Sequence, residues 1–126
     1  RHPRTCACIT KTKEVLLITV DGRNAEAQGM SLQELTFLAK SLGCKSAINL
    51  DGGGSTTMYI KDKPDHGVVN FPSDNKLFDH FGERSVSNIL MILPCISVMT
   101  ISIFSRLSDS NVNATKPLDG LGDTLN

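Results

Sequence analysis

Residues Ser31-Leu32-Gln33-Glu34-Leu35-Thr36-Phe37-Leu38-Ala39-Lys40-Ser41-Leu42-Gly43 carry both the start and the stop signals of an α-helix. Ser31 is a favourable N-cap, and Glu34 three residues later completes a capping box, in which each side chain accepts a hydrogen bond from the other residue's backbone N–H. An apolar stripe at helical spacing consists of Leu35, Leu38, Ala39 and Leu42. Gly43 stands where a left-handed C-terminal cap is expected. The stretch predicts a packed helix at about residues 32–42, and it gives Glu34 a structural role in place of a catalytic one.

Short β-branched segments surround this helix and predict the strands of a sheet. The predicted strands cover residues 5–10, 15–20, 46–50 and 56–60. Lys11-Thr12-Lys13 separates the first two and predicts a hairpin loop, while Asp21-Gly22-Arg23 predicts a turn after the second. The third strand runs directly into a run of three glycines. This order of elements is typical of an α+β fold with a mixed sheet and one packed helix.

The C-terminal part of the sequence contains a long uncharged stretch. No residue from Ser85 to Ser105 is charged, and the stretch is long enough for a transmembrane helix. Pro94 and several Ser and Asn residues favour two strands instead, one within residues 86–93 and one within 96–104. Residues 105–126 are rich in Ser, Asn, Asp and Gly, which is typical of a linker or a disordered tail.

Composition limits the classes of partner. The 126 residues are 40% hydrophobic, which is enough for the core of one folded unit. Thirteen Lys and Arg balance thirteen Asp and Glu, so no net charge favours nucleic acid or an anionic membrane surface. Any anion-binding function must therefore be local. Because the chain opens at Arg1 and shows no secretory leader pattern, we expect a processed or excised piece of a longer protein.

The spacing of the four cysteines does not specify disulfide pairs. Their number neither demands nor excludes disulfides in a chain of this length. On a strand, Cys6 and Cys8 point to the same face and are poorly placed to bond each other. No second close pair of ligands accompanies them, as a structural zinc site requires. Packing as small buried residues is the favoured interpretation.

The run Gly52-Gly53-Gly54 is the strongest chemical signal in the sequence. Three glycines after an apolar strand are costly unless the backbone must approach another group closely. Successive N–H groups in such a loop form an anion-binding concavity, to which Ser55 adds a hydroxyl and Asp51 a carboxylate. The alternative is a tight turn between two strands. We expect the N–H groups of Gly53 and Gly54 to face an open pocket.

Motifs in several parts of the chain fall into register with one enzyme family. They are Arg4-Thr5, residues 20–23, residues 29–35, Leu42-Gly43, residues 47–58, Asn70, residues 72–74 and Glu83-Arg84. In order and spacing they resemble the phosphodiester glycosidase family, which includes the uncovering enzyme N-acetylglucosamine-1-phosphodiester α-N-acetylglucosaminidase and bacterial relatives. The resemblance implies that residues 1–93 are the C-terminal half of such a domain, without the N-terminal half. Residues 94–126 would then add a strand and a linker or disordered tail. Where the family has small residues after Arg-Thr, this chain has Cys6 and Cys8.

The resemblance implies hydrolysis of a sugar-1-phosphodiester to a free sugar and a phosphate monoester. The departing monoester has a second pKa of about 6, so it leaves more readily than a sugar alkoxide. Neutralising its charge matters more than protonating it, and Arg side chains with backbone N–H groups supply this. The residues implied to bind substrate are Arg4, Thr5, Arg23, Gly52, Gly53, Gly54, Ser55 and Arg84. For the carboxylate that activates water or stabilises the transition state, the candidates are Asp51 and Glu83, with Asp21 third.

Two other functions stay open at this stage. The chain could be a non-catalytic module that binds a sugar phosphate, or an inactive truncated domain. An aromatic content of 5% without Trp counts against a module that holds sugars by stacking. No cofactor is established, although carboxylates of Asp21, Asp51 or Asp79 suit a divalent cation such as calcium or magnesium. The resemblance implies a small-molecule or glycan phosphodiester as partner, such as a bacterial exopolysaccharide, and a secreted, periplasmic or lumenal location.

Overall fold

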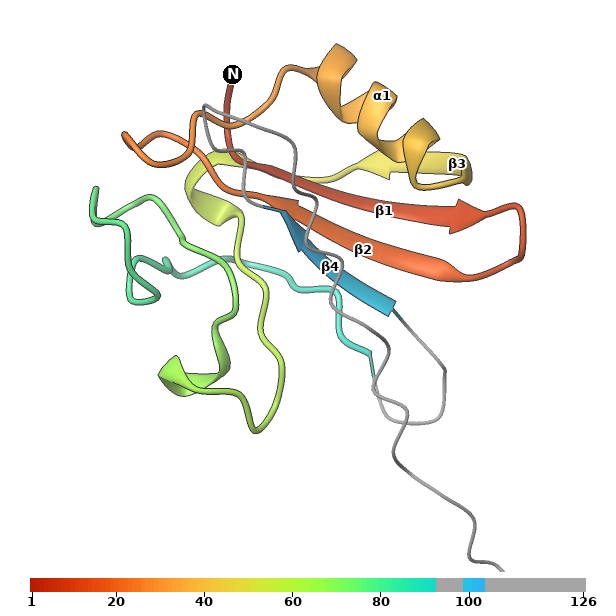
Figure 1. The fold of residues 1–126 in the computed structure, drawn as a ribbon. Coiled ribbons are helices and arrows are strands. Elements are labelled where there is room, and N and C mark those ends of the chain that lie inside the picture. Colours follow the sequence, from red (N-terminus) through yellow and green to blue (C-terminus); the bar gives the residue numbers. More distant parts are fainter. Residues whose placement is uncertain (93–98, 104–126) are drawn as a thin grey trace, which may run out of the picture.

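The computed structural model describes residues 1–92 and, for the backbone, residues 99–103 (Figure 1). The strands are β1 (Arg4–Thr10), β2 (Val15–Val20), β3 (Cys44–Asn49) and β4 (Met99–Ile103), and the α-helix is α1 (Leu32–Ser41). They form one sheet in the order β3-β1-β2-β4. β1 is antiparallel to both β2 and β3, whereas β2 and β4 are parallel. The predicted α+β fold with a mixed sheet is confirmed.

The hairpin of β1 and β2 forms where the sequence predicts it. Arg4 lies opposite Val20, and Ile9 opposite Val15. In the connecting loop, the Glu14 N–H donates to Thr10 Oγ1 at 3.0 Å, while Thr12 Oγ1 donates to Glu14 Oε2 at 2.6 Å. These side chains satisfy loop groups that the sheet cannot reach.

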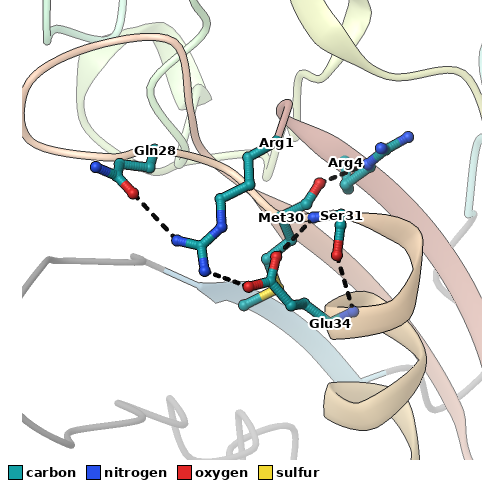
Figure 2. A network of polar contacts seen from close by, with 6 residues as sticks. All are labelled: Arg1, Arg4, Gln28, Met30, Ser31 and Glu34. Carbon is teal, nitrogen blue, oxygen red and sulfur yellow. Dashed lines mark hydrogen bonds and ion pairs between the residues drawn. The ribbon is translucent and has the colours of Figure 1, made fainter.

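Helix α1 begins and ends at the predicted signals. The Ser31 N–H donates to Glu34 Oε2 at 2.8 Å, and the Glu34 N–H donates to Ser31 Oγ at 3.2 Å (Figure 2). Arg1 forms an ion pair with the same Glu34 carboxylate. Gly43 follows the helix with a φ of 80°, a left-handed conformation that glycine adopts readily. Glu34 is thus engaged in capping, as the sequence predicts.

One face of the sheet forms the core under α1. Alternate residues of β1 and β2 point to this face and meet the apolar stripe of the helix. The buried cluster consists of Cys6, Cys8, Leu16, Ile18, Val20, Leu35 and Leu38. Figure 1 shows α1 on one side of the sheet and the segment that follows β3 on the other.

A disulfide joins Cys8 to Cys44, which corrects the expectation that the cysteines pack as small residues. Cys44 begins β3 and pairs with Thr10, so the β1–β3 register brings it to the face of the sheet that Cys8 also occupies. Cys6 is a free, buried thiol, in agreement with the prediction that it does not bond its neighbour Cys8. The pairing depends on strand order, which cysteine spacing alone does not reveal.

Two predicted strands do not form. In residues 56–60 the pairing is reduced to a single bridge between Tyr59 and Val68, because the Met58 N–H donates to the Asn70 side chain. Residues 86–92 form no strand, and Ile89 is 71% exposed. A strand needs a neighbour for its backbone groups, so β-branched composition alone was insufficient.

The other predictions for the C-terminal part have different outcomes. β4 lies within the stretch 96–104 that predicts a strand. The predicted tail, residues 105–126, lies outside the described residues. Within the part that is described, no helix has the length and apolar character needed to cross a membrane.

Candidate functional site

The glycine loop, which we define as Asp51–Ser55, follows β3 and packs on the first residues of the chain. The Leu50 N–H donates to the Thr5 carbonyl at 2.8 Å, and the Gly53 N–H donates to the Pro3 carbonyl at 2.9 Å. A Cβ at Gly52 would lie 2.8 Å from the Pro3 carbonyl oxygen. A side chain at Gly52 would therefore displace the loop from residues 3–5.

The loop forms a 3₁₀ turn over Gly53–Ser55, and most of the N–H groups of residues 52–55 donate to oxygens of the protein. The Gly52 N–H donates to Asp51 Oδ1 at 2.8 Å, and the Ser55 N–H donates to the Gly52 carbonyl at 3.3 Å. Within the described part of the chain, only the Gly54 N–H of these glycines has no hydrogen-bond partner. The expectation that the N–H groups of Gly53 and Gly54 face an open pocket is thus wrong: Pro3 accepts the Gly53 N–H, and both glycines are buried.

Arg23 lies directly against Gly53. A Cβ at Gly53 would lie 2.8 Å from Arg23 Nη2 and 3.0 Å from Nη1, and the φ of Gly53 is 63°. The guanidinium also approaches His2, with 3.4 Å between Arg23 Nη2 and His2 Nδ1. The pKa of His2 is lowered by desolvation and then by positive charges that include Arg23 and Arg4. This edge of the loop is therefore electropositive.

Arg84 reaches the other edge of the loop through Asp74. Arg84 Nε lies 3.4 Å from Asp74 Oδ2, and the Asp74 carboxylate in turn contacts Gly54. The two Arg side chains come from distant segments of the chain, yet the fold brings both to the glycine loop.

Asp51 is exposed at the lip of the loop. Its pKa is held below the usual range by a hydrogen bond from the Ser55 hydroxyl, then by the Gly52 N–H and the charge of Arg84. The carboxylate is therefore ionised at neutral pH. It suits a base or an electrostatic stabiliser and not an acid.

Asp21 belongs to a buried network behind the loop. It follows β2 and is fully buried, and its Oδ1 accepts hydrogen bonds from Asn70 Nδ2 and from the Phe71 N–H, both at 3.0 Å. Burial raises the pKa of Asp21 to about 6, against the opposing effect of these two donors and of His80. Asn70 Nδ2 also donates to the Thr56 carbonyl at 3.0 Å. The network ties the end of β2 to the chain that leaves the glycine loop.

The other predicted site residues lie at different positions. Arg4 Nε donates to the Met30 carbonyl at 2.9 Å, and Thr5 Oγ1 donates to Thr56 Oγ1 at 3.3 Å. Both residues sit beside the loop on β1. Glu83 is exposed, and no hydrogen bond or ion pair connects it to another residue among those described. The fold therefore does not join Glu83 to this group.

Sequence reasoning missed two residues of the site, Asn70 and Asp74. Both stand in motifs that carry the family resemblance, but the stretch around them reads as a turn. No local pattern shows that the Asn70 side chain bonds both to Asp21 and to residues 56–58, or that Asp74 contacts Gly54. The available signal was that Asn70 and Asp74 are polar residues inside motifs that resemble the phosphodiester glycosidase family.

The described part of the chain shows no metal centre. Among residues 1–92 and 99–103, no three His, Cys, Asp or Glu side chains are grouped so that they could hold a metal ion. Asp79 Oδ1 accepts hydrogen bonds from Asn75 Nδ2 at 2.7 Å and from the Phe81 N–H at 2.9 Å.

Comparison with known proteins identifies the family. The sequence profile of the phosphodiester glycosidase family matches residues 1–93. The chain belongs to this family. It is also similar to the SPbeta prophage-derived uncharacterized protein YomE of Bacillus subtilis strain 168, with 35% identity over 126 residues. The match covers 100% of this chain and 17% of that relative's length. No solved structure matches. This phosphodiester glycosidase segment is thus a hydrolase-type domain by family, and the glycine loop lies within the matched residues.

Proposed function

We propose that this protein hydrolyses a sugar-1-phosphodiester to a free sugar and a phosphate monoester, with the glycine loop as its phosphate site. The observation that carries the proposal is the meeting of Arg23 and Arg84 at a loop whose lip holds the ionised carboxylate of Asp51. Two guanidinium groups suit the single negative charge of a phosphodiester and, more closely, the charge of about −1.5 to −2 on the monoester that leaves.

In the proposed reaction, water attacks the anomeric carbon and the bond from this carbon to the phosphate oxygen breaks. The phosphate monoester leaves with that oxygen and its electron pair, and the water supplies the new sugar hydroxyl. Asp51 accepts the proton of the attacking water or stabilises the positive charge that develops on the sugar ring. Its low pKa is compatible with either role, because both need the ionised form.

The other residues take supporting roles in this proposal. The Gly54 N–H and the two guanidinium groups bind phosphoryl oxygens, while Gly52 and Gly53 allow close approach of the backbone. The Ser55 hydroxyl, which donates to Asp51 in the free protein, turns to a phosphoryl oxygen when substrate binds. Arg4 and Thr5 line the site from β1. Asp21 is fully buried, so it supports the loop and does not touch substrate. Glu83 is the remaining candidate for a second carboxylate.

We further propose that other parts of the full protein complete the site and that the reaction takes place outside the cytoplasm on a glycan phosphodiester. The chain spans 17% of the length of the relative it matches, so a large part of that protein has no counterpart in these residues. An N-terminal half of the family domain is the proposed completing part.

Product identity is the test. The full-length protein is incubated with a glycosyl phosphodiester of N-acetylglucosamine, and the products are separated by chromatography and identified by ³¹P NMR. Free sugar and a phosphate monoester support the proposal. Sugar 1-phosphate would identify a phosphodiesterase, and binding without turnover would identify a sugar-phosphate binding module; either result contradicts the proposal.

A further inference from the structure

The carboxylate of Asp74 occupies the space of a side chain at Gly54. A Cβ at Gly54 would lie 1.8 Å from Asp74 Oδ1 and 2.6 Å from Asp74 Cγ. The φ of Gly54 is not in the left-handed region, so backbone conformation does not require glycine here. The absence of a side chain at position 54 is explained by the carboxylate that fills its space.

The second oxygen of the same carboxylate faces Arg84. Asp74 Oδ2 lies 3.4 Å from Arg84 Nε, while Oδ1 is the atom nearest to Gly54. Because a guanidinium carries N–H donors on three nitrogens, a contact at Nε leaves both Nη nitrogens for another acceptor. Asp74 therefore contacts Arg84 at Nε and leaves the pair of Nη nitrogens available to an anion that binds end-on.

Backbone packing keeps these two residues together independently of their charges. A Cβ at Gly82 would lie 2.2 Å from the Pro72 carbonyl oxygen, so the segments around 72–74 and 82–84 touch closely. The Asp74 N–H donates to the Gly82 carbonyl at 3.4 Å. The ion pair is thus part of a packed junction and differs from a chance contact between two mobile surface side chains.

We propose that Asp74 is the positioning residue of the phosphate site, which holds Arg84 at the glycine loop so that both Nη groups face the phosphoryl oxygens. This inference rests on the proposed function, because it requires a phosphate ester in the site. Arg84 is 46% exposed, and without Asp74 its side chain would lose a fixed partner and sample many rotamers. Ordering it again on binding would weaken affinity for the phosphate group.

A double-mutant cycle on the full-length protein tests the inference. Asp74→Asn, Arg84→Gln and the double variant are compared with the wild type. Binding of N-acetylglucosamine 1-phosphate is measured by calorimetry, and sugar release is measured by kinetics. Asp74→Asn should raise Kd and KM roughly two- to fivefold, with kcat within about twofold, since an ion pair of this exposure contributes modestly. In the Arg84→Gln background the same change should have almost no further effect.

Controls keep the outcomes distinct. Asp62→Asn removes an exposed carboxylate that forms no hydrogen bond or ion pair with the other described residues, and it should leave Kd unchanged. Asp74→Ser is a second variant in case Asn at position 74 impairs folding. The wild type could bind and hydrolyse substrate while Asp74→Asn raises Kd and KM by the same factor with and without Arg84. In that case Asp74 does not position Arg84, but the proposed function stands. A wild type that neither binds the sugar phosphate nor releases sugar overturns the proposed function, and this inference with it.

Discussion

The carboxylate of Asp21 accepts two hydrogen bonds through Oδ1, one of them from Asn70 Nδ2 at 3.0 Å, while its Oδ2 is buried without a partner among the described residues. Such an arrangement disfavours the charged form, because burial costs a carboxylate more than two donors to one oxygen return. The pKa of Asp21 is raised from 3.8 to about 6 as a result.

This shift predicts that Asp21 makes the protein less stable as the pH rises. Between about pH 4 and pH 6 the folded state binds more protons at Asp21 than the unfolded state does, so the free energy of unfolding falls as pH increases through this window. The full contribution is roughly 2 to 3 kcal/mol, from about 1.4 kcal/mol per pKa unit. Asp21→Asn should remove this fall in chemical denaturation curves recorded from pH 4 to pH 7. Asp62→Asn is the matched control. If Asp21→Asn has the same pH dependence of stability as the wild type, the raised pKa of Asp21 is wrong.

The contact between Gly54 and Asp74 predicts a rescue in stability. Gly54→Ala places a Cβ 1.8 Å from Asp74 Oδ1, so it should lower the melting temperature by displacing the carboxylate or the loop. In an Asp74→Ala background the space is vacated, and the same change should cost much less. Thermal denaturation of the four proteins measures this difference. Equal losses in both backgrounds would show that another contact makes glycine necessary at position 54.

The disulfide predicts a reductant-sensitive fold. Cys8 and Cys44 are 36 residues apart, and closing a loop of this size stabilises a protein by about 4 kcal/mol in the chain-entropy treatment. Reduction, or Cys8→Ala, should lower the free energy of unfolding by about that amount, and peptide mapping should recover the Cys8–Cys44 pair. Cys6→Ala is the control, since it should keep the reductant sensitivity of the wild type. Insensitivity of the wild type to reductant, with both thiols found free, would contradict the pairing.

Local signals in the sequence predicted the elements that depend on local physics. The capping box of Ser31 and Glu34 and the apolar stripe specify α1 through contacts within a few residues, and the hairpin of β1 and β2 needs only a short loop. The prediction of a strand in residues 86–92 was wrong, because a strand needs a neighbouring strand, and composition does not show whether one is present. The Cys8–Cys44 disulfide was missed for the same reason, since it follows from the neighbour order of β1 and β3.

The candidate site divides in a similar way. The glycine run and the family motifs pointed to the loop, and the fold places Arg23 and Arg84 beside it. The directions of the loop N–H groups were not predictable, because they depend on the packing of the loop against Pro3. Asp74 and Asn70 were missed because their roles are long-range contacts inside a segment that reads as a turn.

The low pKa of Asp51 leads to the last prediction, which concerns turnover. Asp51→Asn retains the size of the side chain and an oxygen for the Gly52 N–H, but it removes the charge that the proposed reaction uses. In the full-length protein kcat should fall roughly 100-fold or more if the carboxylate acts as a base. Ser55→Ala should mainly raise KM, because it removes one hydroxyl donor and leaves the charge of Asp51 in place. Since Asp51 is exposed, the melting temperature of Asp51→Asn should match that of the wild type, which separates loss of chemistry from loss of fold. Unchanged turnover in a folded Asp51→Asn protein would transfer the catalytic carboxylate to another residue, and Glu83→Gln is the next variant to measure.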